Sequence, residues 1–316
     1  MNSLTLRSPA KLNLYLKVHN KRKDGFHNIT TVFERIDLSD EIRLKINPKS
    51  GIKIHCQHPQ VPRGPKNLCF RVAQKLIGDF GIKKGVDIRI QKNIPVAAGL
   101  GGGSSNAATV LLGLNRLFNL KLSQKSLVRY AAQIGSDVAF FLYNYPWAVG
   151  TGRGEVIRKL NIPRRFWHVL VVPKIKVYTK EVYGGLRGYG VSHGAPTKML
   201  TRSTSAKSGH SVSTLSLSNV LTKNTNNVNI LISYLTKSNV IAVGRCLTND
   251  LEAVVFRQYP NLEKLKKRLK LLSNKGVMVS GSGPSVFSLA GSLKEAQALK
   301  RVLSKRYARV FITRTL

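Results

Sequence analysis

Apolar and polar side chains alternate over residues 4–16, the two-residue period of a strand with one buried face. A second stretch of this kind spans residues 32–46, so the chain is expected to open with antiparallel strands. The basic segment 20–25 between them ends in Asp-Gly, which is a turn signal. We expect breaks in the second stretch at Ser39-Asp40 and at Asn47-Pro48.

Helical spacing follows this opening. Apolar residues recur every three or four positions in three segments, which predicts helices over about residues 67–79, 107–118 and 123–134. An alternating strand at 86–90 precedes the second helix. Ser123 and Gly135 are suited to cap the third helix at its two ends. The short apolar segment 138–142 comes next, with Asp137 immediately before it.

The second half of the chain combines both patterns around one polar stretch. Ser, Thr, Gly, Asn and Lys dominate residues 184–227, which we expect to form a loop or a partly disordered insert. Helices are predicted at 228–235, 240–251, 260–272 and 292–303, and strands at 167–172, 277–279, 286–289 and 310–312. This mixture predicts an α+β fold of two domains, an N-terminal one over residues 1–163 and a C-terminal one over residues 164–316.

The composition is that of a globular protein, with 316 residues of which 42% are hydrophobic. Charged and polar residues interrupt positions 1–18, and no apolar run approaches the roughly 18 residues that a membrane helix needs. The 3 cysteines are too few and too widely spaced for a disulfide framework or a closed zinc site. We therefore expect a cytoplasmic protein without a signal peptide.

The charge is unusual, because 52 lysines and arginines against 14 acidic residues give a net charge of +38. A field of this sign attracts polyanions, so nucleic-acid binding is one interpretation. A compositional bias unrelated to function is another. The segment His55-Cys56-Gln57-His58 contains residue types that bind metals, but no second pair lies at zinc spacing. We interpret this segment as structural.

The strongest chemical signal is a glycine-rich segment between the strand at 86–90 and the helix at 107–118. Glycines let the backbone turn its N–H groups toward a phosphate, and serines add donors at the positive end of the following helix dipole. A flexible surface turn is the alternative interpretation. The segment has neither the Gly-Lys-Ser/Thr of a Walker loop nor the spacing of a dinucleotide fingerprint. The residues expected to hold a triphosphate are Pro95, Val96, Ala97, Ala98, Gly99, Leu100, Gly101, Gly102, Gly103, Ser104 and Ser105.

Three motifs, at residues 8–14, 95–108 and 279–287, resemble in their order and spacing the GHMP kinase superfamily of small-molecule kinases. Within it, the chain is similar to one family, the 4-diphosphocytidyl-2-C-methyl-D-erythritol kinases. This closer resemblance spans nearly the whole chain and is weakest over residues 184–227. The motifs that carry it are Ala10-Lys11-Leu12-Asn13-Leu14, Lys23-Asp24-Gly25-Phe26-His27, residues 99–105, Ile134-Gly135-Ser136-Asp137-Val138-Ala139-Phe140-Phe141 and Asn249-Asp250-Leu251-Glu252.

The resemblance implies a fold and a reaction. The fold has an N-terminal ribosomal-S5-like domain and a C-terminal ferredoxin-like domain. The reaction is direct phosphoryl transfer from ATP, accompanied by Mg²⁺, to the 2-hydroxyl of the methylerythritol moiety of a cytidine diphosphate derivative, in the non-mevalonate isoprenoid pathway. The alternatives are another GHMP kinase, acting on homoserine, mevalonate or a sugar, and a basic nucleic-acid-binding protein on the same scaffold. The sequence agrees equally with a monomer and a homodimer.

By similarity to the family, Asp137 and Lys11 are catalytic. Phosphoryl transfer to a hydroxyl needs a base that takes its proton and a cation that lowers its pKa and stabilises the transferring group. The resemblance makes Asp137 the base and Lys11 its partner. The alternatives are that Asp137 caps the next helix and that Lys11 is an ordinary solvated strand residue.

Further binding residues follow from the same resemblance. A cytosine ring needs an aromatic partner and polar groups at its edge. The residues expected to bind the substrate are Asn13, Phe26, His27, Thr179 and Tyr183. Asn67 and Lys92 are expected to approach ATP together with the glycine-rich segment. No protein ligand for Mg²⁺ is assured, and Ser105 is one candidate.

Overall fold

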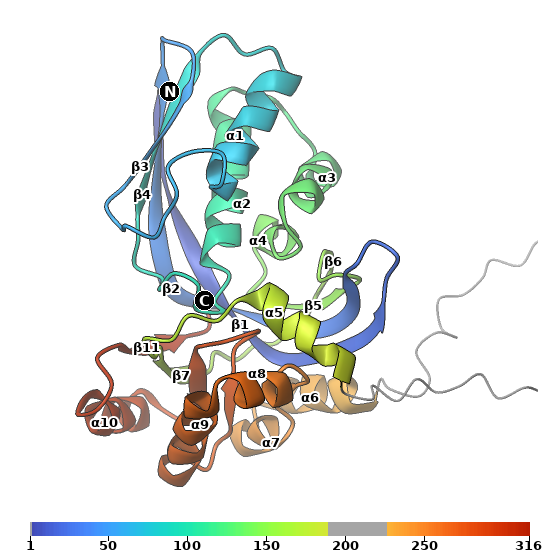
Figure 1. Ribbon diagram of the computed structural model, residues 1–316, viewed down its shortest axis with the longest axis vertical. Coiled ribbons are helices and arrows are strands. Elements are labelled where there is room, and N and C mark those ends of the chain that lie inside the picture. The colour runs from blue at the N-terminus through green and yellow to red at the C-terminus, as the bar shows by residue number, and fades with distance from the viewer. Residues whose placement is uncertain (1, 189–225) are drawn as a thin grey trace, which may run out of the picture.

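Two β-sheets organise the part of the chain described by this computed structural model, residues 2–188 and 226–316 (Figure 1). The first sheet has the order β3 (Ile52–Cys56), β4 (Gly85–Gln91), β2 (His27–Asn47), β1 (Ser3–Lys21) and β8 (Thr248–Asn249), with β5 (Trp147–Thr151) paired to β2 and β6 (Val156–Lys159) paired to β5. The second sheet is antiparallel, in the order β11 (Val310–Arg314), β7 (Trp167–Val171), β10 (Val286–Ala290) and β9 (Val277–Val279). The predicted α+β class is confirmed, whereas the boundary between domains 1–163 and 164–316 stays a prediction.

The long strands β1 and β2 form an antiparallel ribbon with a change of register between Pro9 and Ala10. The break predicted at Ser39-Asp40 is wrong, because β2 continues through both residues. The polar pair is accommodated by this irregularity in the ladder. The buried carboxylate of Asp40 accepts hydrogen bonds of 2.8 Å from the backbone N–H groups of Asn93 and Ile94. The polarity of Asp40 therefore serves a buried contact and does not mark the end of the strand.

Helices α1 (Leu68–Asp79), α2 (Gly102–Leu117), α3 (Gln124–Ile134) and α4 (Val138–Leu142) lie along one face of the first sheet (Figure 1). Leu76 of α1, Leu111 of α2 and Ile88 of β4 belong to the same buried core. The helices predicted over about 67–79, 107–118 and 123–134 are confirmed. Asn67 and Ser123 begin α1 and α3 by accepting backbone N–H bonds in their first turns.

The second sheet has a helical layer on one face and the first sheet on the other. Leu265 of α9 (Pro260–Leu272) and Leu299 of α10 (Leu293–Ser304) share a core with Val169 of β7. The next residue along β7, Leu170, lies in a different core with Leu12 of β1. Because side chains alternate along a strand, β7 supplies both cores. The strands predicted in this half are confirmed to within a few residues.

The elements between β7 and α9 correct one prediction. They are α5 (Thr179–Gly184), the 3₁₀ turn η1 (Gly185–Gly188), α6 (Asn226–Thr236), α7 (Val240–Arg245), β8 and α8 (Glu252–Gln258). A single helix over 240–251 is wrong, since α7 ends at Arg245 and the chain then joins the edge of the first sheet. There Thr248 and Asn249 pair with Tyr15 and Leu16 of β1.

Most of the predicted polar loop, residues 184–227, lies outside the described residues. Its described ends are helical, because η1 reaches Gly188 and α6 begins at Asn226. Strands β3, β5 and β6 were not predicted. They are short, and β5 is buried on both faces, so that it lacks the alternation on which the other strands were recognised. No helix in the described ranges is long and apolar enough to cross a membrane.

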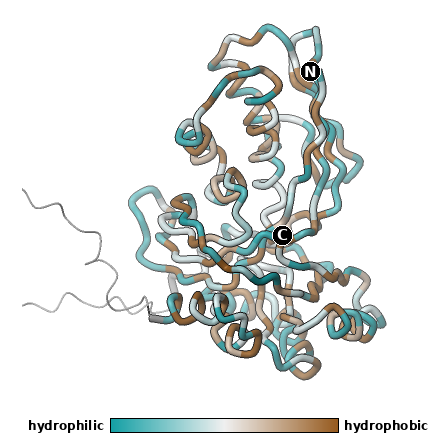
Figure 2. The backbone as a smooth tube through the Cα atoms, turned by 180° about the vertical axis from the view of Figure 1, so that it is seen from behind, coloured by the Kyte–Doolittle hydropathy of each residue, from teal (hydrophilic) through white to brown (hydrophobic). Residues whose placement is uncertain are grey.

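The end of the chain lies where the two halves meet. Figure 2 shows this junction from behind, with the C-terminal residue at the level where the upper and lower halves join. The backbone N–H of Leu316 donates a 3.0 Å hydrogen bond to the carbonyl of Arg35 on β2. Ile36 and Thr315 form a β-bridge beside it. The C-terminal segment is thereby attached to the first sheet.

Candidate functional site

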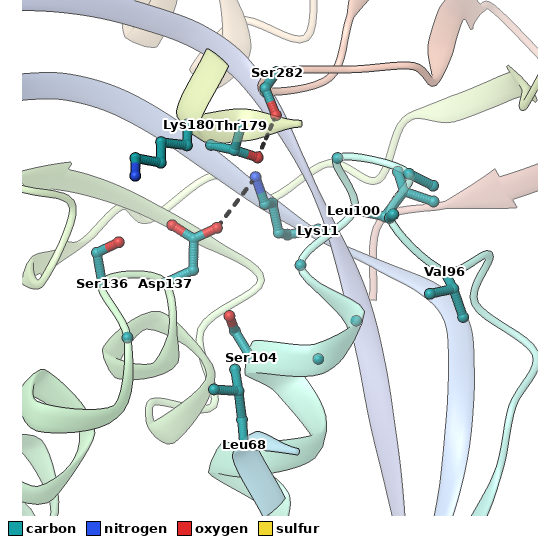
Figure 3. A pocket seen from close by; sticks show the side chains of 18 of the residues that line it. Lys11, Leu68, Val96, Leu100, Ser104, Ser136, Asp137, Thr179, Lys180 and Ser282 are labelled. Atoms are coloured by element: carbon teal, nitrogen blue, oxygen red, sulfur yellow. Dashed lines mark hydrogen bonds and ion pairs between the residues drawn. The ribbon is translucent and has the colours of Figure 1, made fainter. Parts of the chain in front are cut away.

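A cavity of about 1030 Å³ collects residues from segments far apart in the sequence. Its walls come from β1, the segment before α2, the residues before α4, helix α5 and the turn between β9 and β10 (Figure 3). Every site residue predicted from the sequence lines this cavity except Ser105. The cavity is therefore the candidate active site.

Lys11 and Asp137 face each other in this cavity (Figure 3). Nζ of Lys11 lies 3.5 Å from Oδ2 of Asp137 and donates a 2.5 Å hydrogen bond to Oδ1 of Asn13. Asn13 in turn donates a 2.8 Å hydrogen bond to the hydroxyl of Thr31. The lysine side chain is 5% exposed and the aspartate side chain 32%. The lysine is thus fixed from inside the fold, whereas the carboxylate is open to a molecule in the cavity.

The two structural alternatives for these residues are wrong. Asp137 occupies the position before α4, but its side chain makes no capping hydrogen bond to that helix. Its carboxylate is directed to Lys11 instead. Lys11 is buried in β1, so it is not a solvated strand residue. The two charged groups therefore face each other inside the cavity.

The glycine-rich segment passes directly beside Lys11. The backbone N–H of Lys11 donates a 3.0 Å hydrogen bond to the carbonyl of Leu100. Gly101 has a positive φ of 67° and precedes α2, and a Cβ at this position would lie 3.0 Å from Cγ of Lys11. The first turn of α2 contains no acidic residue, so its free N–H groups remain available to an anion.

The turn between β9 and β10 closes the cavity behind the lysine. Oγ of Ser280 donates a 3.1 Å hydrogen bond to the carbonyl of Gly99. A Cβ added to Gly281 would lie 3.3 Å from Oδ1 of Asn13 and 3.5 Å from Nζ of Lys11. The two glycine motifs therefore meet at the same buried lysine, one from each half of the chain.

Two side chains hold this turn in place. Nδ2 of Asn249 donates to the carbonyls of Val279 (2.9 Å) and Gly281 (2.8 Å). The hydroxyls of Thr179 and Ser282 lie 2.8 Å apart, which joins α5 to the turn (Figure 3). The predicted substrate residue Thr179 is thereby placed beside the reacting pair.

An aromatic group lines another part of the cavity. The rings of His27 and Tyr183 have centroids 5.8 Å apart. Phe26 is 52% exposed, and the guanidinium of Arg153 lies 5.1 Å from the centre of its ring. Burial, with a smaller contribution from the charge of Asp137, raises the pKa of the Tyr183 phenol. Tyr183 thus presents a neutral ring to a bound molecule.

The residues expected on the nucleotide side have different surroundings. Nζ of Lys92 forms a buried ion pair with Asp40, at 2.5 Å, and burial lowers the pKa of Lys92 against the opposing effect of that carboxylate. Asn67 lines the cavity and also caps α1. Ser105 is fully buried, and its hydroxyl accepts a 2.8 Å hydrogen bond from Ser8. The structure therefore brings the hydroxyl of Ser104, and not that of Ser105, to the cavity (Figure 3).

Two family models match the chain. The model described as GHMP kinases N terminal domain matches residues 67–145, and the model described as GHMP kinases C terminal matches residues 231–309. A relative from Geobacter metallireducens, named 4-diphosphocytidyl-2-C-methyl-D-erythritol kinase, is 39% identical over 94% of this chain and 92% of its own length. The chain belongs to the 4-diphosphocytidyl-2-C-methyl-D-erythritol kinase family. A Geobacillus thermodenitrificans relative of the same name is 37% identical over 99% of this chain and 97% of its own.

Solved structures agree with this kinase family. A crystal structure of 4-(cytidine 5'-diphospho)-2C-methyl-D-erythritol kinase matches with a TM-score of 0.73 at 29% identity, covering 98% of each chain. A homoserine kinase from Cytophaga hutchinsonii has a TM-score of 0.71 at 20% identity, covering 100% of this chain and 95% of that one, which shows a shared fold alone. The predicted two-domain GHMP kinase fold is confirmed.

Some residues around the kinase site were not singled out from the sequence. Thr31 is buried on β2 and accepts the hydrogen bond from Asn13. It stands between Ile29 and Phe33 on the inward-facing side of the strand, so a polar residue among alternating apolar ones could have marked it. Arg153 lines the cavity and contacts the ring of Phe26, which is distant in the sequence. Among the described residues, no group of three or more His, Cys, Asp and Glu side chains could hold a metal ion.

Proposed function

We propose that the chain transfers the terminal phosphoryl group of ATP to the 2-hydroxyl of 4-diphosphocytidyl-2-C-methyl-D-erythritol. The observation that carries this proposal is the Lys11–Asp137 pair, set in one cavity with a glycine-rich anion site and the aromatic residues Phe26, His27 and Tyr183. Membership of the kinase family supports the same reaction.

In the proposed mechanism, Asp137 is the general base. Its partly exposed carboxylate accepts the proton of the substrate hydroxyl while the hydroxyl oxygen attacks the γ-phosphorus. The bond from the γ-phosphorus to the bridging oxygen of ATP breaks, and ADP leaves. Lys11 stabilises the negative charge on the attacking oxygen and on the transferring group. Asn13 keeps the ammonium of Lys11 in position through their 2.5 Å hydrogen bond.

The proposed donor site is the glycine-rich segment with Asn67. Backbone N–H groups at the start of α2 would receive the phosphates. Lys92 would stabilise the wall of the donor site through its ion pair with Asp40, which balances its charge, and would not bind a phosphate itself. Mg²⁺ bound together with ATP would neutralise phosphate charge. The hydroxyl of Ser104 is an oxygen of the kind that Mg²⁺ accepts, and it faces the cavity.

The aromatic residues favour a cytidylylated substrate over the smaller substrates of other GHMP kinases. Homoserine and mevalonate have no ring that would use the exposed face of Phe26 or the adjacent His27 and Tyr183. We propose that the cytosine ring stacks here while Asn13 and Thr179 contact the polyol end. This site takes a small molecule together with ATP.

The test is ADP release by the purified protein with MgATP, comparing 4-diphosphocytidyl-2-C-methyl-D-erythritol with homoserine, mevalonate and galactose. We expect turnover of the cytidylylated substrate alone. Asp137→Asn should lower kcat by about 100-fold or more, because the base is lost while the shape of the site is kept.

The matched control is Asp79→Asn, which removes an exposed carboxylate paired with Lys75 on α1, outside the cavity. This variant should keep wild-type activity. Equal activity of Asp137→Asn and wild type would exclude Asp137 as the base. Preferred turnover of homoserine, mevalonate or galactose would exclude the proposed substrate.

A further inference from the structure

The cations that line the cavity are not equally available to a ligand. Within the described chain they are Lys11, Lys21, Lys66, Lys92, Arg153 and Lys180. Three of them already face carboxylates: Lys11 pairs with Asp137, Lys92 with Asp40 and Arg153 with Glu155. The carboxylates balance part of their charge within the protein. The other three, Lys21, Lys66 and Lys180, form no ion pair with any described carboxylate.

The remaining cations lie at different places in the cavity. Lys66 directly precedes Asn67, the residue that begins α1 on the proposed ATP side. Lys21 lies opposite His27 in the strand pairing at the end of the β1–β2 ribbon. Lys180 lines the same cavity as Asp137 and Lys11, and in Figure 3 its amine points away from Lys11. It is exposed and forms no hydrogen bond or ion pair with any described residue.

Helix α5 sets Lys180 between the two ends of the proposed substrate. Thr179, the preceding residue, contacts Ser282 beside the reacting pair. Tyr183, one turn further on, lies against His27 in the aromatic group. Residues three apart lie on the same face of a helix, so Lys180 and Tyr183 are neighbours there. From Thr179 to Tyr183 the helix rises by roughly 6 Å, about the length of a diphosphate.

We propose that Lys180 binds the diphosphate that links the cytidine and the polyol of the substrate. This inference rests on the proposed function, because it assumes that the base stacks at Tyr183 and the hydroxyl reacts at Asp137. Lys180 then supplies a positive charge that no described carboxylate balances, and it holds the substrate between its two ends. Lys180 should add no affinity for a ligand such as cytidine, which has the nucleobase but no diphosphate.

The test measures binding of CDP and of cytidine by calorimetry, without ATP, to the wild type and to Lys180→Gln. We expect CDP affinity to fall about tenfold in Lys180→Gln, since a charge-assisted contact is lost, and cytidine affinity to stay within twofold. Lys180→Arg should restore most of the CDP affinity. Turnover should show a raised KM for the cytidylylated substrate and an unchanged KM for ATP.

The matched control is Lys174→Gln, which removes one exposed positive charge from the same segment outside the cavity. Its CDP affinity should equal that of the wild type, so that a general loss of charge is ruled out. Three results would overturn the assignment of Lys180: unchanged CDP affinity in Lys180→Gln, an equal loss for cytidine, or a loss confined to ATP. A wild type that binds neither CDP nor cytidine would overturn the proposed function itself, and this inference with it.

Discussion

The carboxylate of Asp137 is free for chemistry because the helix that follows does not use it. An aspartate before a helix usually accepts N–H bonds from the first turn, and here it makes none. Lys11, in contrast, is held at two points. Its side chain donates to Asn13, and its backbone N–H donates to the carbonyl of Leu100. At the scale of single residues, the site therefore combines one fixed cation with one accessible base.

Gly281 offers a residue-scale prediction. Its φ is 58°, and a methyl group there would lie 3.5 Å from Nζ of Lys11. Gly281→Ala should lose about 1 kcal/mol of unfolding free energy from the backbone conformation and, in addition, at least tenfold in kcat, because its Cβ would lie 3.3 Å from Oδ1 of Asn13, which must shift and which holds Lys11. Urea unfolding and steady-state kinetics measure the two effects.

Gly81 provides the control for this prediction. Its φ of 57° nearly equals that of Gly281, but nothing lies within 4 Å of a Cβ built there. Gly81→Ala should therefore show the same loss of stability and normal kcat. If both variants lose kcat equally, the contact between Gly281 and Lys11 has no bearing on catalysis.

At the scale of elements, α4 is held from its C-terminal end by Arg35. This buried guanidinium donates to the carbonyls of Phe141 (3.4 Å) and Tyr143 and to the side chain of Asn144 (3.0 Å). Burial lowers the pKa of Arg35 to about 10. Cations at the end of a helix satisfy its free carbonyls. The start of the same helix follows Asp137, so we expect a change at Arg35 to reach the base through α4.

Arg35→Met should lower kcat more than it changes either KM, because the site keeps its binding surfaces but α4 shifts. We expect a loss of about tenfold in kcat and about 2 kcal/mol of unfolding free energy, the order for lost hydrogen bonds to a charged group. Steady-state kinetics and urea unfolding measure both.

A double variant separates positioning from damage to the fold. If Arg35 acts through Asp137, Arg35→Met should reduce the residual activity of Asp137→Asn by much less than tenfold. An undiminished tenfold loss in that background would show that Arg35 matters for the fold alone.

The elements also show how far the sequence could predict this molecule. Helices with one apolar stripe, such as α1 and α3, were predicted nearly to the residue because their periodicity and caps are local. Ser39-Asp40 and Thr248-Asn249 were misread because long-range contacts decide them: Asp40 meets Lys92 and the following backbone, and Asn249 meets the turn at Gly281. Lys11 and Asp137 were predicted from motifs, whereas Lys180 and Arg35 required the packed structure.

At the scale of the whole molecule, the two sheets meet over a buried polar contact. Nε2 of His168 on β7 lies 2.8 Å from Oε1 of Glu34 on β2, and both side chains are fully buried. Thr315 donates a 2.5 Å hydrogen bond to the same oxygen. The contact joins the C-terminal sheet and the end of the chain to the sheet that carries Lys11.

Removing one partner of this contact should destabilise the molecule strongly. We expect His168→Leu to lose about 3 kcal/mol of unfolding free energy, because the carboxylate of Glu34 stays buried without its partner. The double variant Glu34→Met, His168→Leu should recover part of this loss, since it removes the buried carboxylate and leaves only the hydroxyl of Thr315 without its acceptor. Urea unfolding checks both.

His55→Leu serves as the control, because His55 is exposed on β3. This variant should change stability by less than about 0.5 kcal/mol. A similar small effect for His168→Leu would mean that the sheets are held together by apolar packing alone.

The turn between β9 and β10 contacts Lys11, but it belongs to the C-terminal part of the chain, which the ribosome synthesises last. N-terminal domains generally fold first during synthesis. A nascent chain can therefore form the loop around Gly101 and display Asp137 while the wall behind Lys11 is still missing. We therefore expect phosphoryl transfer only after the ribosome has synthesised the turn at Gly281. A shorter nascent chain would contain Asp137 and the glycine-rich loop but would have no catalytic activity.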